Sequence, residues 1–137
     1  SDPGFLLVRE ALSLNLKVTC LPGPTAIIPA LVQSGLACDR FVFEGFLPPK
    51  KGRNKRMKKL SDENRTLVFY ESPHKLLKTL TQFSEIFGPD RGVSVSRELS
   101  KMFEETFRGT LVEALNHFNT QSPKGEFVIC VAGSQMK

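Results

Sequence analysis

The stretch Arg65-Thr66-Leu67-Val68-Phe69-Tyr70-Glu71-Ser72-Pro73-His74 passes from an apolar run to a helix start within ten residues. The run 66–70 has the length and the β-branched and aromatic content of a buried strand. Ser72-Pro73 combines an N-cap residue with a proline for the first helical turn, which predicts a helix that Gly88-Pro89 ends. A buried strand that leads directly into a helix is typical of proteins in which helices pack on a sheet.

The alternation of strand and helix continues on both sides of this stretch. Further strands are predicted at 16–20, 41–47, 92–99, 104–109 and 126–132. Further helices are predicted at 2–14, 26–34, 50–60 and 110–118. Because the link between 92–99 and 104–109 is too short for a parallel crossover, this pair should be antiparallel. We expect an α/β (α+β) fold, a mixed sheet of about five strands flanked by helices.

Cap signals mark two of these helices. Asp2-Pro3 offers an N-cap and a first-turn proline, and Thr110-Leu111-Val112-Glu113 has the spacing of a capping box.

Length and composition exclude several classes of protein. The chain has 137 residues, of which 40% are hydrophobic and 24% are charged, so it has the size of one folded domain. No apolar run approaches the ~18 residues of a membrane span, and no signal-peptide pattern occurs. Cys20, Cys38 and Cys130 are far apart, and no C-x-x-C pair is present. We therefore expect no metal site, no disulfide framework and a reducing cytoplasmic location.

The positive charge is concentrated in one segment. Seven of the ten residues from 50 to 59 are basic, and the remaining chain has 12 basic and 14 acidic residues: the seven are Lys50, Lys51, Arg53, Lys55, Arg56, Lys58 and Lys59. Such a cluster suits contact with a phosphate backbone. A solvated helix face is the alternative. No aromatic residue interleaves with the cluster, so base stacking is not indicated there.

Three motifs follow predicted strands, where open α/β sheets bind ligands. They are Leu21-Pro22-Gly23-Pro24-Thr25-Ala26, Tyr70-Glu71-Ser72-Pro73-His74 and Arg97-Glu98-Leu99-Ser100-Lys101. Each alone also fits an ordinary turn or helix cap. No dinucleotide-binding glycine motif, phosphate-binding loop or nucleophile elbow is present.

In this order the three motifs resemble the tetrapyrrole (corrin/porphyrin) methylase superfamily, and most of all its branch that 2′-O-methylates a cytidine ribose in small-subunit ribosomal RNA. Lys124-Gly125-Glu126-Phe127-Val128-Ile129 fits the same pattern. The resemblance implies that 21–137 form the C-terminal methylase domain of this fold. Because Ser1-Asp2-Pro3-Gly4 resembles the tail of a loop in the first domain, 1–20 would be a helix and strand left from an otherwise absent N-terminal domain.

The resemblance also implies a cofactor, S-adenosyl-L-methionine, in a cleft between two domains. Carried over by position, the cofactor-binding residues are Thr25, Ala26, Tyr70, Glu71, Leu99, Gly125 and Glu126. Candidate catalytic residues are Glu71, Glu98 and Lys101. The basic cluster would hold the ribosomal RNA of the 30S subunit, and the parent enzyme is expected to be a homodimer.

Two alternatives to this function stay open. One is a tetrapyrrole methyltransferase, which has no need of an extended basic segment. The other is a non-catalytic RNA-binding module, because the chain without its N-terminal domain is expected to be inactive and to bind the cofactor poorly.

Overall fold

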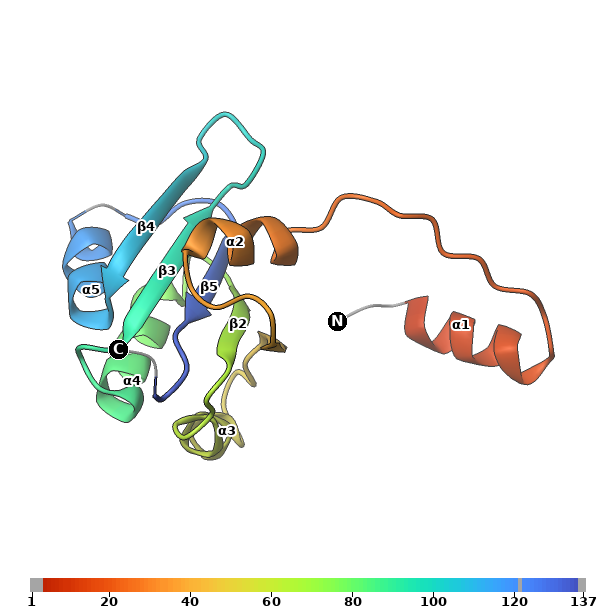
Figure 1. Ribbon diagram of the computed structural model, residues 1–137, viewed down its shortest axis with the longest axis horizontal. Coiled ribbons are helices and arrows are strands. Elements are labelled where there is room, and N and C mark those ends of the chain that lie inside the picture. Colours follow the sequence, from red (N-terminus) through yellow and green to blue (C-terminus); the bar gives the residue numbers. More distant parts are fainter. Residues whose placement is uncertain (1–3, 121, 136–137) are drawn as a thin grey trace.

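In the computed structural model residues 4–120 and 122–135 are described, and they form a mixed five-stranded sheet with helices on both faces (Figure 1). The strands are β1 (Phe41–Phe46), β2 (Thr66–Glu71), β3 (Gly92–Arg97), β4 (Glu105–Thr110) and β5 (Phe127–Val131). The helices are α1 (Gly4–Ser13), α2 (Ile27–Ser34), α3 (Arg53–Leu60), α4 (Leu76–Phe87) and α5 (Leu111–Asn119). The predicted fold class is confirmed.

The sheet order is β1-β2-β5-β3-β4. β1 and β2 are parallel, β5 is antiparallel to both β2 and β3, and β3 and β4 are antiparallel as predicted. It follows that β1, β2 and β3 all end at one edge of the sheet, where β5 begins. This topology brings the predicted motifs that follow β2 and β3 to the same edge.

Two apolar layers hold the helices on the sheet. On one face, α3, α4 and α5 bury side chains against alternate residues of the strands, including Met57, Leu80, Phe83 and Leu111. On the other face, α2 is the described helix that packs over Val68, Val128 and Cys130, through residues such as Leu31. β2 and β5 are buried on both faces because they lie in the middle of the sheet, which explains their nearly continuous apolar sequence.

The segment before α2 departs from the prediction. Residues 16–20 form no strand, because a strand requires a hydrogen-bonded neighbour and no described strand lies beside them. The predicted helix there is present as α1, which lies away from the sheet at the end of an extended segment (Figure 1). The predicted cap at Asp2-Pro3 lies outside the described residues.

Two helix starts test the cap signals. The Thr110 capping box is confirmed, since the Thr110 hydroxyl accepts from the Glu113 amide and the Glu113 carboxylate accepts from the Thr110 amide. The Ser72 cap is wrong. The Ser72 carbonyl accepts from the amides of Lys75 and Leu76, so the chain makes one turn before the regular helix begins at Leu76.

Candidate functional site

A hollow of about 420 Å³ lies at the sheet edge where β1, β2 and β3 end. Its walls come from the start of α2, the end of β1, the turn after β2, the loop after β3 and the start of β5. The size falls within the usual range for small-molecule sites. The lining residues are Ala26, Phe46, Tyr70, Glu71, Ser72, Pro73, Ser96, Glu98, Leu99, Lys101, Glu126, Phe127 and Val128. We call this space the strand-end hollow.

The structure brings most of the predicted cofactor and catalytic residues together in this hollow. Those that line it are Ala26, Tyr70, Glu71, Glu98, Leu99, Lys101 and Glu126. Thr25 and Gly125 are outside the lining. The Thr25 hydroxyl lies 3.4 Å from the Ile27 amide and accepts its hydrogen bond, so it sits at the start of α2 rather than in the hollow. Gly125 instead lies against the side chain of Glu98.

Six residues that line the hollow were not predicted as site residues from the sequence: Phe46, Ser72, Pro73, Ser96, Phe127 and Val128. Phe127 and Val128 belong to the segment Lys124-Gly125-Glu126-Phe127-Val128-Ile129, so their place beside Glu126 was a usable signal. Phe46 had no such signal, since it ends a strand that carried no recognised motif.

Glu98, Lys101 and Glu126 form a charged cluster at the mouth of the hollow. The Lys101 ammonium lies 3.1 Å from Glu98 Oε1 and 3.0 Å from Glu126 Oε2. Glu98 Oε1 also accepts a hydrogen bond of 2.8 Å from the Glu126 amide. That backbone bond, with help from Lys101, lowers the pKa of Glu98. The two carboxylates raise the pKa of Lys101, Glu126 most strongly. Both groups are therefore held in their charged forms.

The backbone around this cluster is strained. Glu98 has φ +48° and Ser100 has φ +63°, values that non-glycine residues seldom adopt. Such strain persists where surrounding contacts enforce it, and it gathers at ligand-binding sites. Gly125 has φ +92°, and a Cβ atom there would lie 2.5 Å from Cγ of Glu98. Glycine is thus required for the Glu98 carboxylate to lie over this turn.

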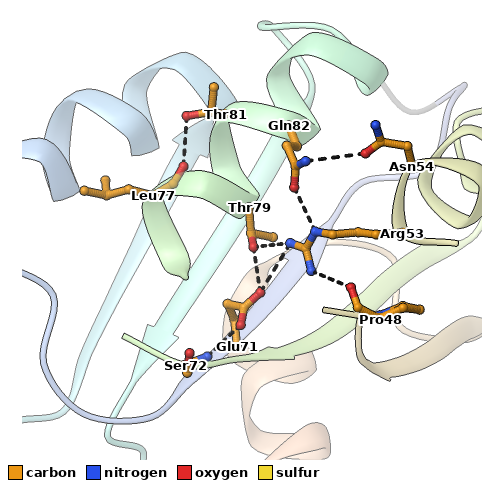
Figure 2. A network of polar contacts seen from close by, with 9 residues as sticks. All are labelled: Pro48, Arg53, Asn54, Glu71, Ser72, Leu77, Thr79, Thr81 and Gln82. Carbon is orange, nitrogen blue, oxygen red and sulfur yellow. Dashed lines mark hydrogen bonds and ion pairs between the residues drawn. The ribbon is translucent and has the colours of Figure 1, made fainter. Parts of the chain in front are cut away.

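Glu71 is held by a buried polar network beneath the hollow, which Figure 2 shows from close by. Its carboxylate accepts hydrogen bonds from the Ser72 amide at 2.8 Å and from the Thr79 hydroxyl at 2.6 Å. Arg53 Nη2 lies 3.7 Å from Oε2 of the same carboxylate. Both oxygens of the carboxylate thus have partners within the protein, which fix its position.

Arg53 corrects one part of the sequence prediction, which placed it with the exposed basic residues. Its side chain is 6% exposed, and besides Glu71 it contacts Thr79, Gln82 and the Pro48 carbonyl (Figure 2). Arg53, Met57 and Leu60 are the buried residues of α3, at the spacing of one helix face. That spacing was the sequence signal that Arg53 points inward.

The other six basic residues, Lys50, Lys51, Lys55, Arg56, Lys58 and Lys59, are exposed on α3 and the loop before it. Arg56 makes a bidentate ion pair with Glu44 of β1, and this hydrogen bonding raises the pKa of Arg56. A second, more open hollow of about 490 Å³ lies here. It is lined by Glu44, Phe46, Leu47, Pro48, Gly52, Lys55, Arg56 and Lys59, and we call it the basic hollow.

Other functional chemistry has little support in the described ranges 4–120 and 122–135. There, no three His, Cys, Asp or Glu side chains gather in a way that could hold a metal ion. Burial raises the pKa of the Cys130 thiol to about 12, so it stays protonated. None of the helices in this part of the chain has the length and apolar character to traverse a lipid bilayer.

The sequence matches a known protein family and several curated proteins. A family model described as Tetrapyrrole (Corrin/Porphyrin) Methylases matches residues 1–115. A Synechocystis sp. protein named ribosomal RNA small subunit methyltransferase I is 47% identical over 135 residues, which cover 98% of this chain and 48% of the relative. A Thermotoga maritima protein of the same name is 44% identical, over 98% of this chain and 60% of its own length. The chain thus spans about half the length of these relatives.

Solved structures share the fold at low sequence identity. The methyltransferase CobJ superposes with a TM-score of 0.68 at 20% identity, over 100% of this chain and 63% of its own. Uroporphyrin-III C-methyl transferase from Thermus thermophilus, complexed with S-adenyl homocysteine, gives a TM-score of 0.60 at 16% identity, over 93% of this chain and 58% of its own.

Proposed function

The chain belongs to the tetrapyrrole (corrin/porphyrin) methylase family, and on that premise we propose that it is the C-terminal part of an S-adenosylmethionine-dependent enzyme that 2′-O-methylates a cytidine ribose of small-subunit ribosomal RNA. One observation carries the proposal: the strand-end hollow and the exposed basic face of α3 meet at Phe46, which lines both hollows. A small-molecule site beside a phosphate-binding surface is what RNA methylation needs. The names of the relatives at 44% and 47% identity support this substrate.

The residues of the strand-end hollow fit the proposed cofactor. Ala26, Leu99 and Val128 give apolar walls for a nucleoside, and the charged cluster lies at one side. The cofactor, when bound, supplies an activated methyl group on a sulfonium. We propose Tyr70, Glu71, Thr25, Gly125 and Glu126 as further parts of this site, with Thr25 and Gly125 acting through the α2 start and the Glu98 loop.

We assign positioning roles, rather than proton transfer, to the three candidate catalytic residues. Glu71 is buried and engaged by Arg53 and Thr79. Glu98 and Lys101 are held in their charged forms by each other and by Glu126. A fixed carboxylate and ammonium at the mouth of the hollow can hydrogen-bond ribose hydroxyls and align the 2′-oxygen with the methyl group.

The exposed basic residues of α3 are proposed to hold RNA phosphates. Exposed cations of this kind neutralise phosphates and position RNA without reading its sequence. This chain covers only 48% and 60% of the two relatives, so we propose an N-terminal domain that completes the cofactor cleft. Exposed apolar side chains of α1 such as Leu6, Leu7 and Leu12 support a packing partner of this kind. The homodimer and the cytoplasmic location stay predictions.

The test is methyl transfer by the full-length enzyme. With labelled S-adenosylmethionine and 30S subunits, we expect label at a cytidine 2′-oxygen, which nuclease digestion and mass spectrometry of the RNA would locate. Lys101→Ala should reduce transfer strongly, whereas Lys78→Ala, an exposed lysine on α4 that lines neither hollow, should not.

Two outcomes would contradict the proposal. Label in a tetrapyrrole acceptor and none in RNA would favour the porphyrinoid alternative. RNA binding without any methyl transfer or cofactor binding by the full-length protein would favour a non-catalytic module.

A further inference from the structure

Phe46 is a large aromatic side chain that the fold leaves in solvent between the two hollows. It is 58% exposed, and it lines both the strand-end hollow and the basic hollow. In the basic hollow its neighbours include Lys55, Arg56 and Lys59. An exposed aromatic ring beside three cations is well suited to bind a ligand that has both an aromatic part and negative charge.

A bulge in β1 places Phe46 there. Phe43 pairs with Val68, but Gly45 pairs with Phe69, so Glu44 is an extra residue in the strand. Gly45 has φ +61°, the left-handed conformation that such bulges use. In a regular strand, residues three apart point to opposite faces. The extra residue cancels this alternation, and both Phe43 and Phe46 therefore lie on the face of Tyr70.

The contacts of these rings confirm that geometry. The ring centroids of Phe46 and Tyr70 are 5.6 Å apart, and those of Phe43 and Tyr70 are 5.1 Å apart. Tyr70 therefore supports the Phe46 ring, which retains more than half of its surface for another partner. The same bulge residue, Glu44, holds Arg56 by two hydrogen bonds and so fixes a guanidinium in the basic hollow.

We propose that the basic hollow is a nucleotide subsite in which Phe46 stacks against an RNA base while Lys55, Arg56 and Lys59 bind the adjoining phosphates. The proposal rests on the proposed function and adds the contact to a base, which the basic cluster alone could not provide. Its ligand is a single-stranded nucleotide next to the methylated ribose, because a base in a duplex has no free face for the ring. The aromatic residue comes from β1, outside the cluster in sequence.

The test compares two polyanions on the full-length enzyme. Single-stranded oligocytidylate has bases and phosphates, whereas inorganic polyphosphate has the charge alone. Phe46→Ala should weaken oligocytidylate binding about 5- to 150-fold, the range for loss of one stacked base, and leave polyphosphate binding unchanged. Phe46→Trp should retain the affinity. The salt dependence of binding should be unaltered by Phe46→Ala, because no phosphate contact is lost.

Matched variants separate the possible failures. Phe43→Ala is the control, since Phe43 is exposed on the same face and lines neither hollow. Lys55→Ala/Lys59→Ala should weaken binding of both polyanions and reduce the salt dependence.

If only the lysine variant weakens binding, the stacking subsite is wrong and the phosphate contact stands. If neither variant affects RNA, the RNA surface of the proposed function is itself wrong. If Phe46→Ala instead weakens only S-adenosylmethionine binding, Phe46 lines the cofactor site and the proposed nucleotide subsite is wrong.

Discussion

Arg53 and Glu71 form an ion pair inside the domain, with Arg53 Nη2 3.7 Å from Glu71 Oε2 and both side chains less than a tenth exposed. Arg53 comes from the inner face of α3, and Glu71 ends β2 beneath the strand-end hollow. The Thr79 hydroxyl bridges them, since it accepts from Arg53 and donates to Glu71. The pair therefore fixes the basic helix to the end of the strand that lines the hollow.

Loss of one partner of this pair should be costly for folding. Arg53→Met leaves the Glu71 carboxylate buried without its counter-charge, and we expect a loss of about 3–5 kcal/mol in the free energy of unfolding, measured by urea denaturation. Arg53→Met/Glu71→Leu removes both charges and should recover part of this loss. Lys55→Met on the exposed face of the same helix is the control, expected within about 0.5 kcal/mol of the parent. Equal effects for Arg53→Met and Lys55→Met would show that the pair is unimportant.

Gly125→Ala should disturb the Glu98 loop. The residue combines φ +92° with a Cβ position 2.5 Å from Glu98 Cγ, so alanine is strained and must displace the carboxylate. We expect a loss of about 1 kcal/mol or more in stability, and weaker S-adenosylmethionine binding by the full-length enzyme in calorimetry. Gly23→Ala has open space around its Cβ and should be nearly neutral. If Gly125→Ala binds the cofactor with unchanged affinity, the Glu98 loop is not part of the cofactor site.

Acid should weaken the folded state partly through Glu98. The pKa of Glu98 is lowered in the fold, so its contribution to stability is complete above its ordinary pKa of about 4.3 and is lost as the pH falls through the lowered value. Urea midpoints between pH 7 and pH 3 should therefore fall less steeply for Glu98→Gln than for the parent. Glu104 and Glu113 also have lowered pKa values in the fold, so the urea midpoint of Glu98→Gln should still fall with falling pH.

The Thr110 capping box should contribute measurably to α5. Thr110→Ala removes the acceptor for the Glu113 amide, and N-cap losses of this kind cost about 1 kcal/mol. Thr81→Ala is a suitable comparison, because that exposed hydroxyl donates to the Leu77 carbonyl within α4 and caps nothing. A thermal-unfolding series in which the two variants are equally stable would argue against the cap.

The features that sequence reasoning predicted well are local or periodic. The apolar runs of β2 and β5 are long enough to show buried strands, and Thr110 and Glu113 are only three residues apart. The motifs after β2 and β3 meet because parallel strands end at the same edge. These properties depend on neighbouring residues or on a general rule of sheet topology.

The remaining features depend on contacts between distant segments. The predicted strand 16–20 has no partner in the described residues, and the sequence alone cannot show whether a partner exists. In the sequence, Glu71 is a candidate catalytic carboxylate. The structure places Arg53, which lies 18 residues earlier, beside it, and the sequence gives no sign of this contact. The place of Phe46 depends on one extra residue in β1, which shifts the pairing with β2 and which no composition or motif reveals.

β1 is an outer strand of the sheet, and among the described residues it pairs with β2 alone. The unpaired backbone amides and carbonyls of an outer strand can template pairing with another molecule. The bulge at Glu44 interrupts their regular spacing and increases the local twist of the strand, which hinders such addition. An exposed aromatic side chain such as Phe46 on an outer strand would favour aggregation through that strand. The extra residue that turns Phe46 toward solvent should therefore also hinder aggregation through β1.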